Sequence, residues 1–422
     1  MRKTAPVYQE INTIPIIRAE RIYLDNGMPL FALKAGTQDI IKITLLFNAG
    51  SIYQSAPLVS FAANSLLSEG SRKYTATQIS EMNDFHGSYL TCSTDKDFAS
   101  VTLLTLRKHL DQILPVLEDV VKYPAYPEKE MQSFIARHSQ QFLVEEAKTR
   151  VIAHRRFLKA LFGDEHPYGH ELQLSDFQNL DVEQLRRFYS TYYYPANCRI
   201  IVSGNVDNKD IQLLNKHLGD DSWQKNTSGI LPEYSFSEEQ QYHQNIKKEG
   251  AVQSSIRIGK QVCNKQHQDF SGLTVLNTLL GGYFGSRLMR NIREDKGYTY
   301  GINSLLVSLK KAGYLTIVTD VGIDVVQPAL KEIYKEIERL QQDLVPDEEL
   351  QMVKTHLMSE MLRSFDGPFA QAESLIALLE YDLDENYYEQ YIHHIKNIDA
   401  KEIQKLSQQY LDVQRIYEVV VG

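Results

Sequence analysis

Residues 50–70, which read G-S-I-Y-Q-S-A-P-L-V-S-F-A-A-N-S-L-L-S-E-G, predict one short amphipathic helix. Ser55 is a favourable N-cap, Pro57 suits the first turn, and Gly70 is placed to end the helix. Apolar and small side chains follow at the spacing of a single helical face: Leu58, Phe61, Ala62, Ser65 and Leu66.

The chain repeats one pattern in its two halves. Each half has an apolar helical stripe followed by a proline that opens the next helix, Pro127 in the first half and Pro346 in the second. The stripes are Leu110, Ile113, Leu114, Leu117 and Val120, and then Leu330, Ile333, Ile337 and Leu340. Each half also ends in a β-branched run that stops at glycine, Gly204 and Gly422. The prolines are 219 residues apart and the glycines 218, which indicates a duplicated domain because solenoid periods are only about 20–50 residues.

The order of these elements favours an α+β fold, because long helices mix with strands without regular alternation. The stretch from Asp220 to Glu249 is polar and rich in turn-forming residues, which is typical of a linker. We therefore expect an N-terminal domain at residues 1–219, a linker at 220–249 and a C-terminal domain at 250–422. Each domain is long enough to bury its own core.

Composition excludes several classes of function. The 422 residues are 43% hydrophobic and 23% charged, as in ordinary globular proteins, and the net charge of −9 argues against nucleic-acid binding. No stretch approaches 18 apolar residues, so no membrane span is expected. Three scattered cysteines, Cys92, Cys198 and Cys263, favour a reducing compartment, and we expect the cytoplasm.

Several stretches resemble the insulinase/pitrilysin family of metallopeptidases, whose members include single-length bacterial proteins and split, two-subunit enzymes. They are residues 50–70, 126–131, 166–169, 188–197 and 279–300. The resemblance covers nearly the whole chain. It implies two related α+β domains, each with a mostly antiparallel sheet packed against helices.

In that family, the stretch matching residues 50–70 carries the inverted zinc motif H-x-x-E-H, in which two His bind zinc and the Glu activates water. Here Ser60, Ala63 and Asn64 stand at those three positions, off the predicted apolar face. The family's third ligand, a Glu, aligns with Gln141, which lies 77 residues after Asn64. Because these neutral side chains are poor zinc ligands, the resemblance implies neither metal nor cofactor in this chain. An ordinary amphipathic helix with no metal-binding ancestry is the alternative.

The strongest match is residues 279–300, L-L-G-G-Y-F-G-S-R-L-M-R-N-I-R-E-D-K-G-Y-T-Y. Its residues predict a glycine-rich turn, then a helix capped by Ser286 and ended by Gly297. Tyr298 and Tyr300 would follow on one face of a strand.

In the family's split enzymes, one subunit supplies an Arg and a Tyr from this segment to the zinc site of the other. By position these are Arg293 and Tyr300, which would bind the substrate carbonyl and stabilise the tetrahedral intermediate at the partner's zinc. Gly281 and Gly282 are secondary candidates for contact with substrate. The alternative is that Arg293 is a solvated cation at a helix end and Tyr300 a packing residue.

The resemblance therefore implies a non-catalytic subunit of a heterodimeric zinc endopeptidase. The partner would be a homologous H-x-x-E-H subunit that holds the zinc, and the substrate a peptide or unfolded segment enclosed between the two. A second hypothesis is a peptide-binding or scaffold protein of the same fold with no catalytic role. An independent hydrolase is disfavoured, because the chain has no G-x-S-x-G elbow and no cysteine with an evident histidine partner.

Overall fold

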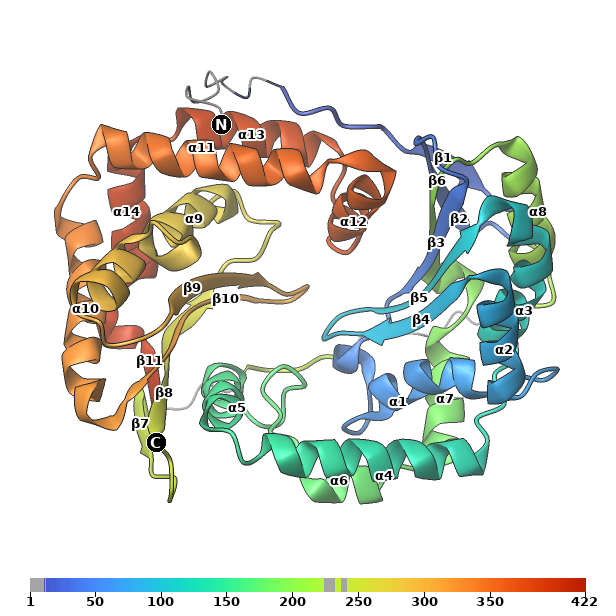
Figure 1. Ribbon diagram of the computed structural model, residues 1–422, viewed down its shortest axis with the longest axis horizontal. Coiled ribbons are helices and arrows are strands. Elements are labelled where there is room, and N and C mark those ends of the chain that lie inside the picture. Colours follow the sequence, from blue (N-terminus) through green and yellow to red (C-terminus); the bar gives the residue numbers. More distant parts are fainter. Residues whose placement is uncertain (1–10, 12, 224–231, 237–240) are drawn as a thin grey trace, which may run out of the picture.

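Each half of the chain forms one β-sheet covered on its outer face by helices, and the two sheets lie toward opposite ends of the molecule (Figure 1). The computed structural model describes residue 11 and residues 13–223, 232–236 and 241–422. This is the α+β architecture that the sequence predicts.

The first sheet contains six described strands in the order β1-β2-β6-β3-β5-β4. Their bounds are β1 (Glu20–Tyr23), β2 (Pro29–Lys34), β3 (Ile40–Phe47), β4 (Tyr89–Thr94), β5 (Ala99–Leu106) and β6 (Cys198–Gly204). β2 and β6 pair in parallel, whereas the other neighbouring strands pair antiparallel.

The second sheet contains five described strands in the order β7-β11-β8-β10-β9. They are β7 (His243–Ile246), β8 (Gln253–Val262), β9 (Ile302–Ser308), β10 (Gly313–Gly322) and β11 (Tyr417–Val421). β11 runs parallel to β7, and the remaining pairs are antiparallel. Strands β7 to β11 thus take the same order and directions as strands β2 to β6, as an internal duplication requires.

Helices fill the connections between the strands. Those of the first half are α1 (Val59–Ser65), α2 (Ala76–His86), α3 (Leu110–Lys122), α4 (Glu128–Glu145), α5 (Thr149–Phe162), α6 (Leu174–Gln178), α7 (Val182–Tyr192) and α8 (Asn208–Leu218). Those of the second half are α9 (Phe270–Asn277), α10 (Val326–Gln342), α11 (Asp347–Ser364), α12 (Gly367–Leu379), α13 (Asn386–Asn397) and α14 (Ala400–Tyr410). Two π-helical segments, η5 (Thr278–Gly282) and η6 (Met289–Asp295), follow α9.

The two predicted apolar stripes form corresponding parts of the two cores. The stripe of α3 is buried under the first sheet and that of α10 under the second, and each of these residues is at most 5% exposed. The helices that follow begin directly after Pro127 and Pro346, as predicted. Burial of each large apolar side chain contributes about 1.5–3 kcal/mol to folding, so the stripes are major contributors to both cores.

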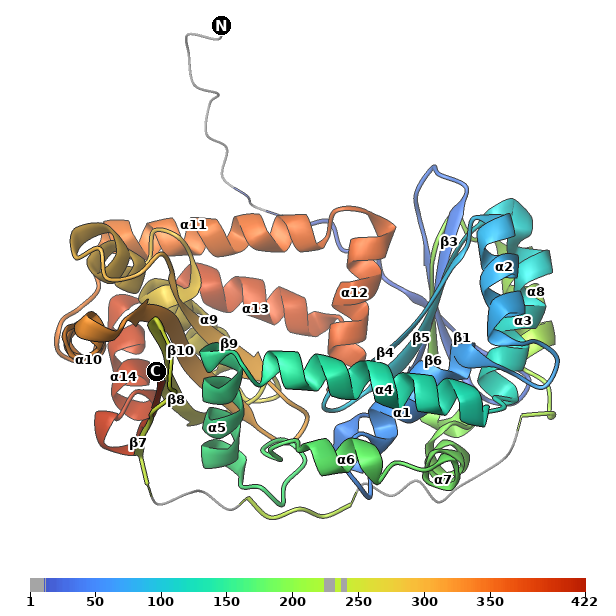
Figure 2. The ribbon, with the colours of Figure 1, turned by 60° about the horizontal axis from the view of Figure 1, so that its bottom comes forward.

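Each half also lends one helix to the sheet of the other half (Figure 2). α5 lies on the inner face of the second sheet, where Gln261 of β8 donates a hydrogen bond to the carbonyl oxygen of Leu161 (2.5 Å). α12 lies on the inner face of the first sheet, where Leu375 and Ile376 pack with Leu46. The two halves therefore complete one another's packing.

The boundaries at residues 219 and 250 stay a prediction. The segment predicted as a linker, 220–249, contains β7, which pairs with β11 as the outer strand of the second sheet. Trp223 is 1% exposed and donates a hydrogen bond from its indole nitrogen to the carbonyl oxygen of Tyr193 (3.2 Å). The described ends of this segment are thus packed, one against each half.

Candidate functional site

Helix α1, which carries three of the four predicted zinc-site positions, begins at Val59. The prediction of Ser55 as its N-cap is wrong. Leu58 holds the N-cap position with a φ of 66°, so the preceding turn, not Ser55, sets the start of the helix. The side of the helix opposite the apolar stripe is buried as well, because Ser60, Ala63 and Asn64 are 0% exposed. α1 lies between α7 and strands β4 and β5, so both of its faces are covered.

The side chain of Asn64 is fully engaged in hydrogen bonds. Its Nδ2 donates to the carbonyl oxygens of Ser93 (2.8 Å) and Ser100 (3.2 Å), and its Oδ1 accepts from the hydroxyl of Tyr193 (3.0 Å). Burial raises the pKa of Tyr193 well above its ordinary value, so this hydroxyl stays protonated and able to donate. Asn64 thus ties α1 to strands β4 and β5 and to the end of α7.

The neighbouring positions are equally unsuited to a metal. The Ser60 hydroxyl is buried and has no hydrogen-bond partner among the described residues, and Ala63 offers only its carbonyl oxygen, which accepts from the hydroxyl of Tyr126 (3.0 Å). Gln141 is exposed on α4, and within the described residues no hydrogen bond joins it to α1.

Aromatic rings occupy the contact between α1 and α4. The Phe61 ring centroid lies 5.3 Å from that of Phe134 and 5.1 Å from that of His138. Among the described residues, no three His, Cys, Asp or Glu side chains gather in an arrangement that could hold a metal ion. The residues at the zinc positions therefore do not fit zinc, because they offer one committed amide, one hydroxyl, one methyl and one distant amide.

The glycine pair of the second half lies in the π-helical segment η5. A Cβ on Gly281 would lie 2.6 Å from the backbone nitrogen of Ser304 and 2.7 Å from its Cβ, so the close approach of η5 to β9 requires glycine here. A Cβ on Gly282 would have no neighbour closer than 3.2 Å. Ser286 does not cap the helix as predicted, because its buried hydroxyl has no hydrogen-bond partner in the described part of the chain.

Arg293 lies on η6, and its guanidinium carbon is 4.6 Å from the ring centroid of Phe284, a cation–π contact. In the described chain, its guanidinium forms no ion pair or hydrogen bond. Its donor hydrogens therefore remain available to a ligand, while the ring restricts where the group can lie. Phe284 was missed in the sequence; the signal was a large aromatic residue in a glycine-rich turn, which is 62% exposed here.

Tyr300 is 93% exposed and precedes β9, so the predicted strand with Tyr298 and Tyr300 on one face is wrong. The chain turns at Gly297, which has a φ of 66°. The Thr299 hydroxyl then bonds to the carbonyl oxygens of Gly301 (3.0 Å) and of Asp320 on β10 (2.7 Å). These bonds hold the loop outside the sheet. The phenol of Tyr300 consequently projects from a braced loop and has no hydrogen-bond partner among the described residues.

A duplicated α+β fold whose helix at the zinc-motif position is packed for stability defines a metallopeptidase-like protein without the metal site. Two family profiles match successive parts of the chain. Residues 30–167 match "Insulinase (Peptidase family M16)", and residues 179–357 match "Peptidase M16 inactive domain". The chain belongs to the M16 insulinase family.

Relatives include both zinc-protease and inactive types. The "Uncharacterized zinc protease YmxG" of Bacillus subtilis is 23% identical over 82% of this chain and 85% of its own length. The "Probable inactive metalloprotease YmfF" of the same species is 22% identical over 55% of this chain and 54% of its own length. Subunit alpha-1 of the mitochondrial-processing peptidase of Dictyostelium discoideum is 25% identical over 48% of this chain and 32% of its length.

Solved structures share the fold over almost the whole chain. A crystal structure of a peptidase M16 inactive domain from Pseudomonas fluorescens has a TM-score of 0.87 at 20% identity and covers 96% of this chain and 98% of its own. A protease from Helicobacter pylori has the same TM-score at 18% identity, and the match covers 96% of this chain and 100% of its own.

Over the described part of the chain, no helix combines the length and apolarity needed to cross a membrane.

Proposed function

We propose that this chain is the non-catalytic subunit of a heterodimeric zinc metalloendopeptidase. It would form half of a peptide-binding chamber and lend Arg293 and Tyr300 to the zinc site of a homologous H-x-x-E-H partner. The observation that carries the proposal is a contrast within one molecule. The zinc positions are committed to the core through Asn64, whereas among the described residues neither Arg293, which contacts only the Phe284 ring, nor Tyr300 has a hydrogen-bond or ion-pair partner.

The chemistry assigned to this chain is electrostatic. A guanidinium presents a rigid fork of donors and a phenol adds one more, and both suit the charge that develops on a scissile carbonyl oxygen. The Phe284 ring would orient Arg293 and leave its positive charge unneutralised, whereas a carboxylate partner would neutralise it. Activation of the hydrolytic water would belong to the partner, since the residues at the zinc positions of this chain do not fit the metal.

Relatives support a two-subunit arrangement. Bacillus subtilis has one relative named a zinc protease and another named probably inactive, and a further relative is by name a subunit of a processing peptidase. We propose the cytoplasm as the location. Peptides or unfolded segments are the proposed substrates.

The test is to mix this chain with a homologous H-x-x-E-H chain from the organism that encodes this protein. Neither chain alone should cleave a fluorogenic peptide, whereas the mixture should. Arg293→Ala and Tyr300→Phe should each lower kcat by about 10²–10³, the usual effect of removing one oxyanion donor, while size-exclusion chromatography still shows the complex. Arg415→Ala is a matched control, because this arginine is a surface cation with a 77% exposed side chain.

Full activity of both variants in an intact complex would reject the assigned roles of Arg293 and Tyr300. It would leave the alternative, a peptide-binding or scaffold protein of the same fold. Zinc bound stoichiometrically at α1 of the isolated chain would reject the proposal as a whole.

A further inference from the structure

The backbone of η6, which carries Arg293, is π-helical, a conformation that is rare and occurs mostly at functional sites. Its last wide turn is closed by the amide of Lys296, which donates to the carbonyl oxygen of Asn291 (3.0 Å). The amide of Tyr298 then donates to the carbonyl oxygen of the residue after Asn291 (3.0 Å). The loop that leads to Tyr300 is therefore tied by its backbone to the middle of η6, so the positions of both proposed donors depend on where this segment lies.

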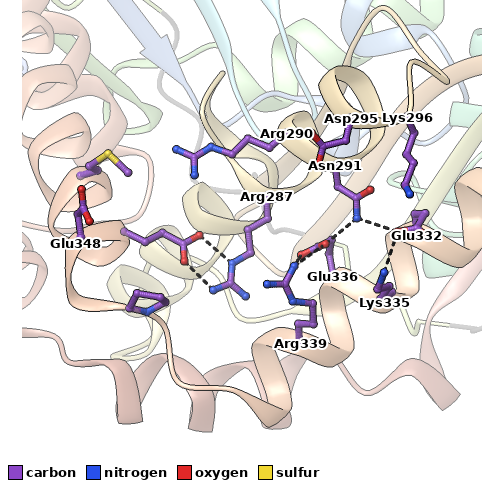
Figure 3. A pocket seen from close by; sticks show the side chains of 13 residues that line it. Arg287, Arg290, Asn291, Asp295, Lys296, Glu332, Lys335, Glu336, Arg339 and Glu348 are labelled. Carbon is purple, nitrogen blue, oxygen red and sulfur yellow. Dashed lines mark hydrogen bonds and ion pairs between the residues drawn. The ribbon is translucent and has the colours of Figure 1, made fainter.

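The side chain of Asn291 joins η6 to α10 (Figure 3). Its Nδ2 donates to the carboxylates of Glu332 (2.9 Å) and Glu336 (2.7 Å), which uses both amide hydrogens. These two acceptors are four residues apart on α10, so their Cβ atoms are separated by about 5–6 Å along one face of the helix. Both bonds form at only one position of η6 along α10, because a hydrogen bond needs a donor–acceptor distance of about 2.7–3.2 Å. Apolar packing has no direction and would let the two elements slide.

A second contact holds the residues just before η6. Arg287 is 9% exposed, and its Nε and Nη2 donate to the two carboxylate oxygens of Glu349 on α11 at 2.9 and 2.8 Å. This bidentate pair fixes the plane of the guanidinium. Glu336, which is 2% exposed, is itself restrained by an ion pair with Arg339 (3.0 Å). The acceptors of this network are thus held in place on α10 and α11 before they hold η6.

The network contacts one side of η6, and the proposed donor lies on another. Asn291 lines the charged cavity between η6, α10 and α11, whereas Arg293 is not among its described lining residues and stacks on the Phe284 ring. That ring is 62% exposed, so it restricts the guanidinium without fixing the backbone that carries it. Misplacement of a group in an active site by about 1 Å can cost about 10²-fold in rate, so the register of η6 on α10 bears directly on turnover.

We propose that Asn291 is a positioning residue for the two donors. Its amide, held between Glu332 and Glu336, sets where Arg293 and Tyr300 lie, and it contacts neither the substrate nor the partner's zinc. The role rests on the proposed function, because it has a consequence for catalysis only if these two donors act in the partner's site.

The test is steady-state cleavage of a fluorogenic peptide by this chain mixed with its homologous H-x-x-E-H partner. Asn291→Leu keeps the approximate size of the side chain and removes both hydrogen bonds to α10. It should lower kcat by about 10-fold to 100-fold, the effect of a displacement of up to about 1 Å, while KM changes by less than about twofold. Gln351→Leu, the same kind of change at an exposed position of α11, should leave kcat and KM unchanged.

A double variant separates positioning from stability. In the Arg293→Ala background, Asn291→Leu should cause a loss of kcat at least about threefold smaller than in the parent, because one donor through which it acts is gone. A purely structural residue would lower kcat by the same factor in both backgrounds. Glu332→Met, which removes one of the two acceptors at a side chain that is 15% exposed, is the milder second variant and decides the outcome if Asn291→Leu does not assemble with the partner.

Unchanged kcat in Asn291→Leu, or in Glu332→Met where that variant decides, would overturn the positioning role if Arg293→Ala and Tyr300→Phe still lower kcat. The proposed function would then stand. Equal losses in the parent and in the Arg293→Ala background would also overturn it, because Asn291 would then act on stability alone. Full activity of Arg293→Ala and Tyr300→Phe is the separate result that rejects the proposed function, and the positioning role falls with it.

Discussion

Replacing Asn64 with leucine tests whether the former zinc position now serves the core. Leucine has a similar size but removes two donated hydrogen bonds, to Ser93 and Ser100, and one accepted from Tyr193. A neutral hydrogen bond contributes about 1 kcal/mol net, so the loss of three should lower the free energy of unfolding by about 3 kcal/mol. The apolar contacts of leucine offset part of this loss.

The assay is urea unfolding followed by circular dichroism, with the slope m compared between variants. Tyr193→Phe removes one of the three bonds and should cost about 1 kcal/mol, and the double variant should cost less than the sum because the sites share that bond. Gln141→Leu is the control, since an exposed substitution usually stays within about 0.5 kcal/mol. A cost below about 1 kcal/mol for Asn64→Leu, with m unchanged, would refute the reasoning.

Three further predictions follow from other parts of the fold. Burial and then the nearby carboxylates raise the pKa of Glu380 to about 7. The protonated side chain therefore stabilises the fold at a pH below the ordinary pKa of glutamate, and this contribution is lost as the pH rises toward 7. Glu380→Gln should flatten that decline in stability, measured as urea midpoints from pH 4.5 to 7.5. Gly281→Ala should lower the melting temperature through its clash with the backbone of Ser304, at a cost of about 1–3 kcal/mol, whereas the melting curve of Gly301→Ala, where a Cβ would meet no atom within 4 Å, should stay close to that of the parent. Arg199→Met removes the hydrogen bond to the last residue of α12 (2.9 Å) and should speed amide hydrogen exchange in that helix, and unchanged exchange would contradict its docking role.

The sequence alone determined the fold class and the loss of the metal site. Apolar stripes with helical spacing need a sheet or helix to cover them, and two such stripes followed by prolines 219 residues apart indicated the duplication. Serine, alanine, asparagine and glutamine are poor zinc ligands wherever the chain places them, so the sequence was enough to predict that Ser60 and Asn64 do not bind the metal.

Only the tertiary structure decided what these positions do instead. Hydrogen bonds from Asn64 to β4, β5 and Tyr193 join segments up to 129 residues apart, and no local pattern encodes such contacts. The exchange of α5 and α12 between the halves, and the loop that holds Tyr300 outside β9, were equally beyond local propensity. Periodicity reports which face of an element is apolar, but it does not report which distant element covers that face, and here that choice placed α5 and α12 on the sheets of the opposite halves.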